Sequence, residues 1–102
     1  MKRGEYWVDG PSIRIARAIL WALNKIRKER PSGRDYEWIN VIDIIQKAKD
    51  VSYPSFHTIL EKWRKADQAE VLTTLYDSDK YSVFRISPEL EKNLNEIVRP
   101  YQ

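Results

Sequence analysis

Apolar residues recur every three or four positions along four stretches of the chain, which is the spacing of helices with one buried face. The first stretch covers residues 9–30, with Asp9 or Ser12 as its expected cap and Pro31 and Gly33 as its end. Its expected buried residues are Ile15, Ala16, Ile19, Leu20, Leu23 and Ile26. The pattern therefore predicts a long amphipathic helix at the start of the fold.

A short aromatic segment, residues 36–40, is β-prone and leads into a second helix, NVIDIIQKAKD. Asn40 and Asp43 have the spacing of a capping box at the start of that helix. The residues expected to face the core are Ile42, Ile45 and Ala48. This stretch therefore predicts a short strand followed directly by a helix.

The third helix is predicted over residues 52–67, because Ser52 can cap it and Pro54 lies just inside its start. Its expected buried stripe consists of Phe56, Ile59, Leu60 and Trp63. The positions opposed to that stripe are Pro54, Thr58, Glu61 and Lys65, with His57 and Lys62 on the flanks. One side of this helix is therefore expected to meet a polar partner or solvent.

Residues 71–87 alternate as two strands around a polar loop of four residues, 77–80, which predicts a β-hairpin. One face of its first strand carries Leu72, Thr74 and Tyr76, and the other carries Val71, Thr73 and Leu75. Ser87 and Pro88 then begin a last helix, which Pro100 ends.

The last helix carries an apolar stripe of Leu90, Leu94, Ile97 and Val98. This stripe can fold back on the first helix of its own chain, or it can pair with a second copy. Symmetric pairing is the commonest form of oligomer, so we expect a homodimer through the C-terminal helix and the first helix.

With 102 residues, 42% of them hydrophobic, the chain is expected to form one folded domain. It contains no cysteine, which excludes disulfides, and no apolar run long enough to span a membrane. We therefore expect a soluble protein of the cytoplasm.

The net charge of +3 is distributed unevenly. Residues 1–34 carry nine Lys or Arg against three acidic residues, whereas the remainder carries nine against twelve. On the first helix, the face opposite the apolar stripe presents Arg14, Arg17, Trp21, Lys25 and Lys28. This stripe either binds a polyanion or is a solvated surface on which Trp21 packs under Tyr6 and Trp7.

The element order of helix, strand, helix, helix, hairpin and helix resembles the winged helix-turn-helix superfamily of DNA-binding domains. The resemblance covers residues 13–87 and includes the segment WINVIDIIQKAKDVSYPSFHTILEKWRKADQAEV. It implies a mostly helical α+β fold with a three-helix core and a β-hairpin wing over residues 12–87. Residues 1–11 would form an N-terminal arm, and residues 88–102 an extra helix and candidate dimerisation element.

In this family, apolar residues matching Ile45, Val51, Phe56, Leu60 and Trp63 join the second and third helices. The third helix lies in the major groove of DNA and exposes the residues matching Tyr53, Ser55, Thr58 and Lys62. The chain departs from the family at two positions where Gly is common, since Asp50 and Asp67 stand there. Asp can also adopt the left-handed conformation. Asp77 and Asp79 outnumber Lys80 at the wing tip, which disfavours a wing contact with DNA.

The start of the third helix suits a phosphate, because free backbone N–H groups and the hydroxyls of Ser52 and Ser55 lie at the positive end of the helix dipole. His57, Thr58 and Lys62 could then reach base edges. The full set of candidate DNA-binding residues is Ser52, Tyr53, Ser55, His57, Thr58, Lys62, Lys65, Arg14, Arg17 and Lys80. The alternative is that this helix is an ordinary solvated one.

No motif indicates catalysis, a metal or a cofactor. A zinc site needs three or four ligands, but the chain has one His and no Cys, and its three glycines form no phosphate-binding loop. We therefore expect a non-enzyme that binds specific double-stranded DNA, a small transcriptional regulator. The alternative is a winged-helix adaptor that binds another protein and has non-specific affinity for nucleic acid.

Overall fold

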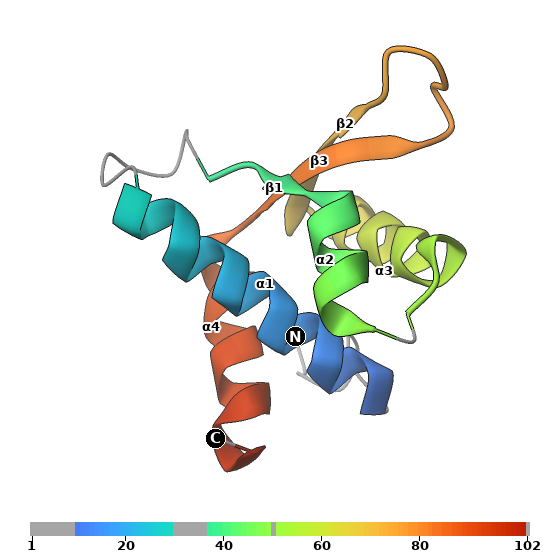
Figure 1. The fold of residues 1–102 in the computed structure, drawn as a ribbon. Helices are drawn as coiled ribbons and strands as arrows, with labels where there is room; N and C mark the ends of the chain where they lie inside the picture. Colours follow the sequence, from blue (N-terminus) through green and yellow to red (C-terminus); the bar gives the residue numbers. More distant parts are fainter. Residues whose placement is uncertain (1–9, 30–36, 50, 102) are drawn as a thin grey trace.

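Four helices and three short strands make up the described part of this computed structural model, which covers residues 10–29, 37–49 and 51–101 (Figure 1). In chain order they are α1 (Gly10–Glu29), β1 (Ile39–Asn40), α2 (Val41–Ala48), α3 (Tyr53–Lys65), β2 (Ala69–Thr73), β3 (Tyr81–Ile86), α4 (Pro88–Val98) and the 3-10 turn η3 (Arg99–Tyr101). The expected class, α+β and mostly helical, is confirmed.

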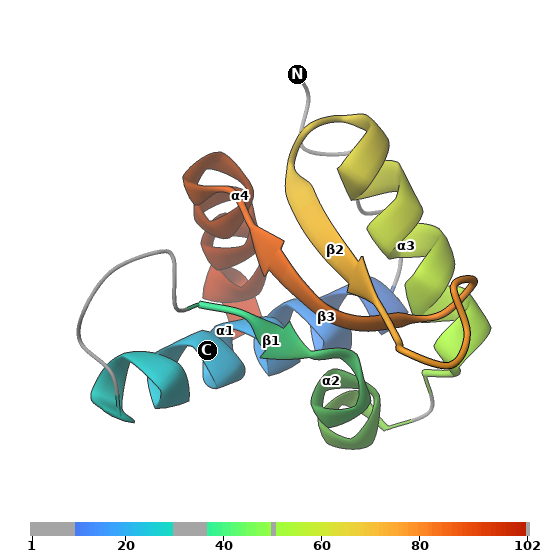
Figure 2. The same ribbon diagram turned by 90° about the horizontal axis from the view of Figure 1, so that it is seen from above.

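The three strands form one antiparallel sheet in the order β1-β3-β2. β3 is central, so Phe84 faces Ile39 of β1 on one side and Val71 of β2 on the other. Figure 2 shows β3 between its two neighbours, with α3 running beside β2. The segment 36–40 was expected to be a strand, but only Ile39 and Asn40 pair, and residue 36 lies outside the described residues.

The apolar stripe of α1 is buried as predicted, with Ile15, Ile19 and Leu23 at 0–2% exposure. The helix already begins at Gly10, so residues 10 and 11 of the expected arm belong to it, and Ser12 lies inside the helix and is not its cap. Residues 1–9, including the alternative cap Asp9, lie outside the described residues. α1 contacts both α2 and α4, which makes it the central helix of the fold.

Of the three residues expected on the buried face of α2, Ala48 is buried as predicted, whereas Ile42 and Ile45 are not. Val41 and Ile44 are fully buried, whereas Ile42 is 57% exposed and Ile45 is half-buried. Ile39 of β1 points into the core, so the alternation of the strand also directs Val41 inward where the helix begins. Asn40 is the N-cap residue of α2 with the extended backbone usual at that position, but the expected capping box is absent because its side chain makes no capping hydrogen bond.

The stripe of α3 is confirmed, since Phe56, Leu60 and Trp63 have 0% exposure. The ring of Phe56 meets that of Phe84 edge to face, with the ring centres 5.4 Å apart and the planes at 77°.

A Schellman motif ends α3, in which the Gln68 N–H donates to the carbonyl of Trp63 at 2.8 Å and the Asp67 N–H to that of Arg64 at 3.1 Å. Asp67 has a φ of 58°, so Asp does adopt the left-handed conformation that usually favours Gly. Asp50 lies outside the described residues; its neighbour Lys49 has a φ of 50°.

The hairpin connection is longer than predicted, because β2 ends at Thr73 and β3 begins at Tyr81. Leu75 and Tyr76, expected on a strand, lie in this connection and are 94% and 97% exposed. The register shifts between Leu72 and Thr73, and the Thr74 hydroxyl then donates to the Asp77 carbonyl at 2.8 Å and accepts from the Asp77 N–H at 3.0 Å. These hydrogen bonds between Thr74 and Asp77 replace the pairing between strands at this point, so the chain folds into a loop.

The C-terminal helix is part of the core. Ser87 accepts the Leu90 N–H at 3.0 Å, as expected of a cap. Leu90, Leu94 and Val98 are 0–1% exposed, so the apolar stripe packs within its own chain, against α1. The sequence allowed the stripe either to fold back on the first helix or to pair with a second copy. In the structure it folds back on α1, so little of it is left for a second copy.

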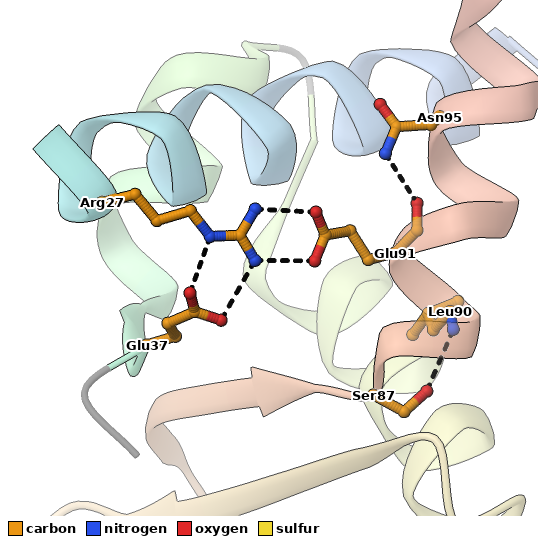
Figure 3. Close-up of polar contacts among 6 residues, drawn as sticks. All are labelled: Arg27, Glu37, Ser87, Leu90, Glu91 and Asn95. Carbon is orange, nitrogen blue, oxygen red and sulfur yellow. Dashed lines mark hydrogen bonds and ion pairs between the residues drawn. The ribbon is translucent and has the colours of Figure 1, made fainter. Parts of the chain in front are cut away.

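Arg27 near the end of α1 joins three segments of the chain (Figure 3). Its guanidinium donates two 2.7 Å hydrogen bonds to the carboxylate of Glu91 on α4. It also donates to Glu37, before β1, at 2.6 and 3.1 Å. These bonds raise the pKa of Arg27 and lower the pKa of Glu91. The ion pairs therefore hold α4 and the start of β1 against α1.

We predict that the register of α2 can be tested with two isoleucines on the same helix. Ile44→Ala should lower the free energy of unfolding by about 2–5 kcal/mol, because it leaves a cavity in the core. Ile42→Ala should lower it by less than about 0.5 kcal/mol, since that side chain is mostly in solvent. Urea unfolding of both variants measures the difference, and a larger loss for Ile42→Ala would contradict the observed face.

A second prediction concerns acid stability. The folded state lowers the pKa of Glu91 below its ordinary 4.5. The stabilisation that ionised Glu91 contributes is therefore present above the pKa of Glu91 in the unfolded chain. It is lost as pH falls through the lower pKa that Glu91 has in the folded chain. Glu91→Gln should cost about 1 kcal/mol at neutral pH, a figure discounted for the partial exposure of the pair. Thermal unfolding should show a smaller loss at a pH well below 4.5 than at neutral pH, and no loss in an Arg27→Gln background. An equal loss at both pH values would refute the role of this pair.

Candidate functional site

The buried stripe of α3 divides its remaining residues between two sides of the helix. At about 100° per residue, Tyr53, His57 and Glu61 lie on the flank toward the hairpin, and their side chains are half-buried. The other side carries Ser55, Thr58, Lys62 and Lys65, all exposed. We call these four residues the open face of α3.

The hairpin flank is occupied by Tyr81 at the start of β3. The His57 ring stacks on the Tyr81 ring at a centroid distance of 4.5 Å, and the Tyr81 N–H donates to the Tyr53 hydroxyl at 2.6 Å. The Tyr81 hydroxyl donates to the Glu61 carboxylate. Tyr53 and His57 were expected among exposed contact residues, but both side chains take part in joining α3 to the hairpin.

Glu61 also pairs with Arg64 one helical turn later, through hydrogen bonds of 2.9 and 3.0 Å. The bond to Arg64 is the main cause that lowers the pKa of Glu61. Burial, in contrast, raises the pKa of Tyr53. The Glu61 carboxylate therefore stays ionised at neutral pH and offsets the charge of Arg64, which leaves Lys62 and Lys65 as the main positive charges of α3.

The first turn of α3 offers fewer free groups to a phosphate than the sequence predicted. The Ser52 hydroxyl oxygen accepts the Ser55 N–H at 3.3 Å and donates to the Ser55 hydroxyl at 3.0 Å. Pro54 has no N–H at all. An anion at this end would therefore meet the Ser55 hydroxyl and the helix dipole more than a row of free N–H groups.

On the open face, the Thr58 hydroxyl donates to the Pro54 carbonyl at 3.0 Å. This bond uses the hydroxyl hydrogen, so Thr58 offers a partner its methyl group and the lone pairs of its oxygen. Lys62 and Lys65 form no ion pair with another described residue. The open face thus combines two lysine ammonium groups, the Ser55 hydroxyl as a donor and the Thr58 methyl group on one helix.

The remaining predicted residues lie elsewhere. Lys80 is on the hairpin connection, with its Nζ 4.0 Å from an Asp77 carboxylate oxygen. Arg14 and Arg17 are exposed on α1 and line a hollow of ≈ 550 Å³ together with Lys47 and Lys49 from the end of α2. We call this hollow the basic groove. The sequence analysis missed Lys47 and Lys49, whose signal was their place on the outward side of the second helix.

Trp21 lies beside the basic groove and is 40% exposed. The Nζ atom of Lys47 is 4.6 Å from the ring centre, and that of Lys25 is 5.4 Å away. Both are distances at which a cation is attracted to an indole. The alternative contact with Tyr6 and Trp7 falls outside the described residues. Trp21 therefore belongs to the surface shared by α1 and α2.

Residues 10–29, 37–49 and 51–101 contain no group of three His, Cys, Asp or Glu residues placed to hold a metal ion. None of their helices combines the length and the apolar character that crossing a membrane requires.

Comparisons with protein-family models, with curated proteins and with solved structures find no match to this chain.

Proposed function

We propose that the chain is a winged helix-turn-helix domain that binds double-stranded DNA and serves as a small transcriptional regulator. In this proposal α3 enters the major groove with its open face toward the bases. The observation that carries it is the division of α3, in which the stripe of Phe56, Leu60 and Trp63 is fully buried while the opposite side remains exposed and positive.

The element order supports the winged-helix assignment. α2 and α3 follow each other after a short turn, and α3 leads directly into the hairpin of β2 and β3, which projects beyond the helices in Figure 1. The short strand β1 completes the sheet beside β3. In this arrangement α3 is held from behind by the core and from the side by Tyr81, so its open face is presented rigidly.

The open face has chemistry suited to a major groove. A helix with its side chains is about 10–12 Å across, which fits the groove width of about 12 Å. Lys62 can donate to the acceptors of guanine, and the Thr58 methyl group can pack on the methyl of thymine. Ser55 and Lys65 are suited to the phosphates on either side, which position the helix without reading sequence.

The hairpin tip favours the second candidate function, a protein-binding adaptor. Leu75 and Tyr76 expose almost their entire side chains, next to the acidic Asp77 and Asp79. Apolar side chains beside carboxylates suit a protein surface better than a phosphate backbone. We therefore propose no contact between the wing and DNA. Lys80, the one lysine predicted to make such a contact, lies close to the Asp77 carboxylate.

A homodimer remains a proposal that needs a different surface from the one predicted. Leu90, Leu94 and Val98 are buried in their own chain, so a second copy could use only the outward side of α4 or other elements. Duplex recognition by α3 does not depend on this pairing.

We predict that variants of the open face change sequence preference. A duplex would first be selected from a random library, and affinities measured by fluorescence anisotropy. Thr58→Ala and Lys62→Ala should each cost about 1–3 kcal/mol on the selected duplex and much less on random DNA, because base contacts are lost. Lys65→Ala should weaken both duplexes alike and reduce the slope of log affinity against log salt by about 0.9.

Lys92→Ala is the matched control, because Lys92 is an exposed lysine on α4, away from the open face. It should leave both affinities unchanged. The adaptor would be favoured instead if selection enriched no sequence and the Thr58 and Lys62 variants bound DNA as the unaltered chain does.

A further inference from the structure

The basic groove gathers four cations from two helices. Arg14 and Arg17 lie on α1, Lys47 lies on α2, and Lys49 is the residue that directly follows α2. No described residue that lines the groove is acidic. The charged side chains that line this hollow are all positive, which favours a polyanion as its ligand.

An aromatic platform continues this groove along the same two helices. A neighbouring hollow is lined by Trp21 and Lys25 from α1 and by Asp43, Gln46 and Lys47 from α2. Gln46 and Lys47 line both hollows, so the indole and the four cations belong to one continuous surface. A phosphate end and an aromatic end therefore lie side by side.

This combination selects among polyanions. Phosphodiester groups need the cations, and an exposed indole offers stacking to a flat base. In duplex DNA the faces of the bases are covered by their neighbours in the stack, whereas an unpaired strand can turn a base outward. We propose that the basic groove and Trp21 form a binding site for single-stranded nucleic acid, with one base stacked on Trp21 and the adjoining phosphates bound by Arg14, Arg17, Lys47 and Lys49.

The lysines near the indole give this site an exchange mechanism. Without a ligand, the Lys47 and Lys25 ammonium groups lie close to the Trp21 ring. A base that stacks on the ring displaces an ammonium group from that face, and the long lysine side chain can then move to a phosphate beside the base. Binding thus replaces a weak cation–π contact with stacking and a charge-assisted hydrogen bond.

Asp43 gives the surface a direction. It lies at the Trp21 end, where its carboxylate would repel a phosphate but can accept a hydrogen bond from a base N–H group, such as N3–H of thymine. The cations of the basic groove lie at the other end. None of the residues around these two hollows belongs to α3, so this site is separate from the open face and extends the proposed function.

The experiment measures binding of a fluorescein-labelled oligothymidylate of about ten nucleotides, a length within the usual footprint of such sites. Trp21→Leu should weaken binding about tenfold, because the stacked base is lost, while Trp21→Phe should retain most of the affinity. Lys47→Gln with Lys49→Gln should reduce the slope of log affinity against log salt by about 1.4, which is about 0.7 for each phosphate contact.

Lys62→Gln with Lys65→Gln is the matched control, since it removes two lysines from α3. It should leave oligothymidylate binding unchanged and weaken binding to a duplex. If Trp21→Leu fails to fold in a thermal melt, the two lysine pairs decide between the outcomes by themselves.

Three results would overturn the site. The first is no binding of oligothymidylate, the second is equal binding by the chain with Lys47→Gln and Lys49→Gln, and the third is unchanged binding by a folded Trp21→Leu variant. Loss of duplex binding alone on changing α3 would leave the site intact, and loss of the site would leave duplex recognition by α3 intact. The two proposals therefore fail separately.

Discussion

Burial of Phe56, Leu60 and Trp63 is the constraint on which the surface of this protein depends. These side chains anchor α3 to the core, where Phe56 meets Phe84 of the central strand edge to face. Because a helix is rigid, burying one stripe determines which residues can face outward. Tyr81 then closes one flank through contacts with Tyr53, His57 and Glu61. What remains outward is Ser55, Thr58, Lys62 and Lys65, and the proposed function rests on them.

α1 has a comparable influence on the other side of the molecule. Its apolar stripe packs against α2 and α4, and Arg27 links its last turn to Glu91 and Glu37 (Figure 3). The C-terminal helix is therefore a structural part of the fold. With the stripe turned inward, the basic side of α1 lies beside the lysines at the end of α2. The proposed single-strand site follows from that packing.

Much of this arrangement could be predicted from the sequence, because the stripes of α1, α3 and α4 are long and unambiguous. The buried face of α2 could not be predicted, because Val41 with Ile44 and Ile42 with Ile45 form two possible stripes one residue apart. The pairing of Ile39 with Phe84 decides between them. The hairpin loop depended on hydrogen bonds of Thr74 with Asp77. Within the candidate site, the contacts of Tyr53 and His57 with the hairpin could not be predicted, because Tyr81, their partner, lies more than twenty residues away in the sequence. Lys47 and Lys49 were overlooked because only the packing of α2 on α1 brings them to Arg14 and Arg17.

Recognition of duplex DNA by α3 can be tested with a map of backbone amide shifts. The isotopically labelled chain would be titrated with a duplex selected from a random library while two-dimensional NMR spectra are recorded. The account predicts the largest shifts at Ser55, Thr58, Lys62 and Lys65, with small changes along α4. Shifts confined to α1 and α2, or to the hairpin tip at Leu75 and Tyr76, would contradict it.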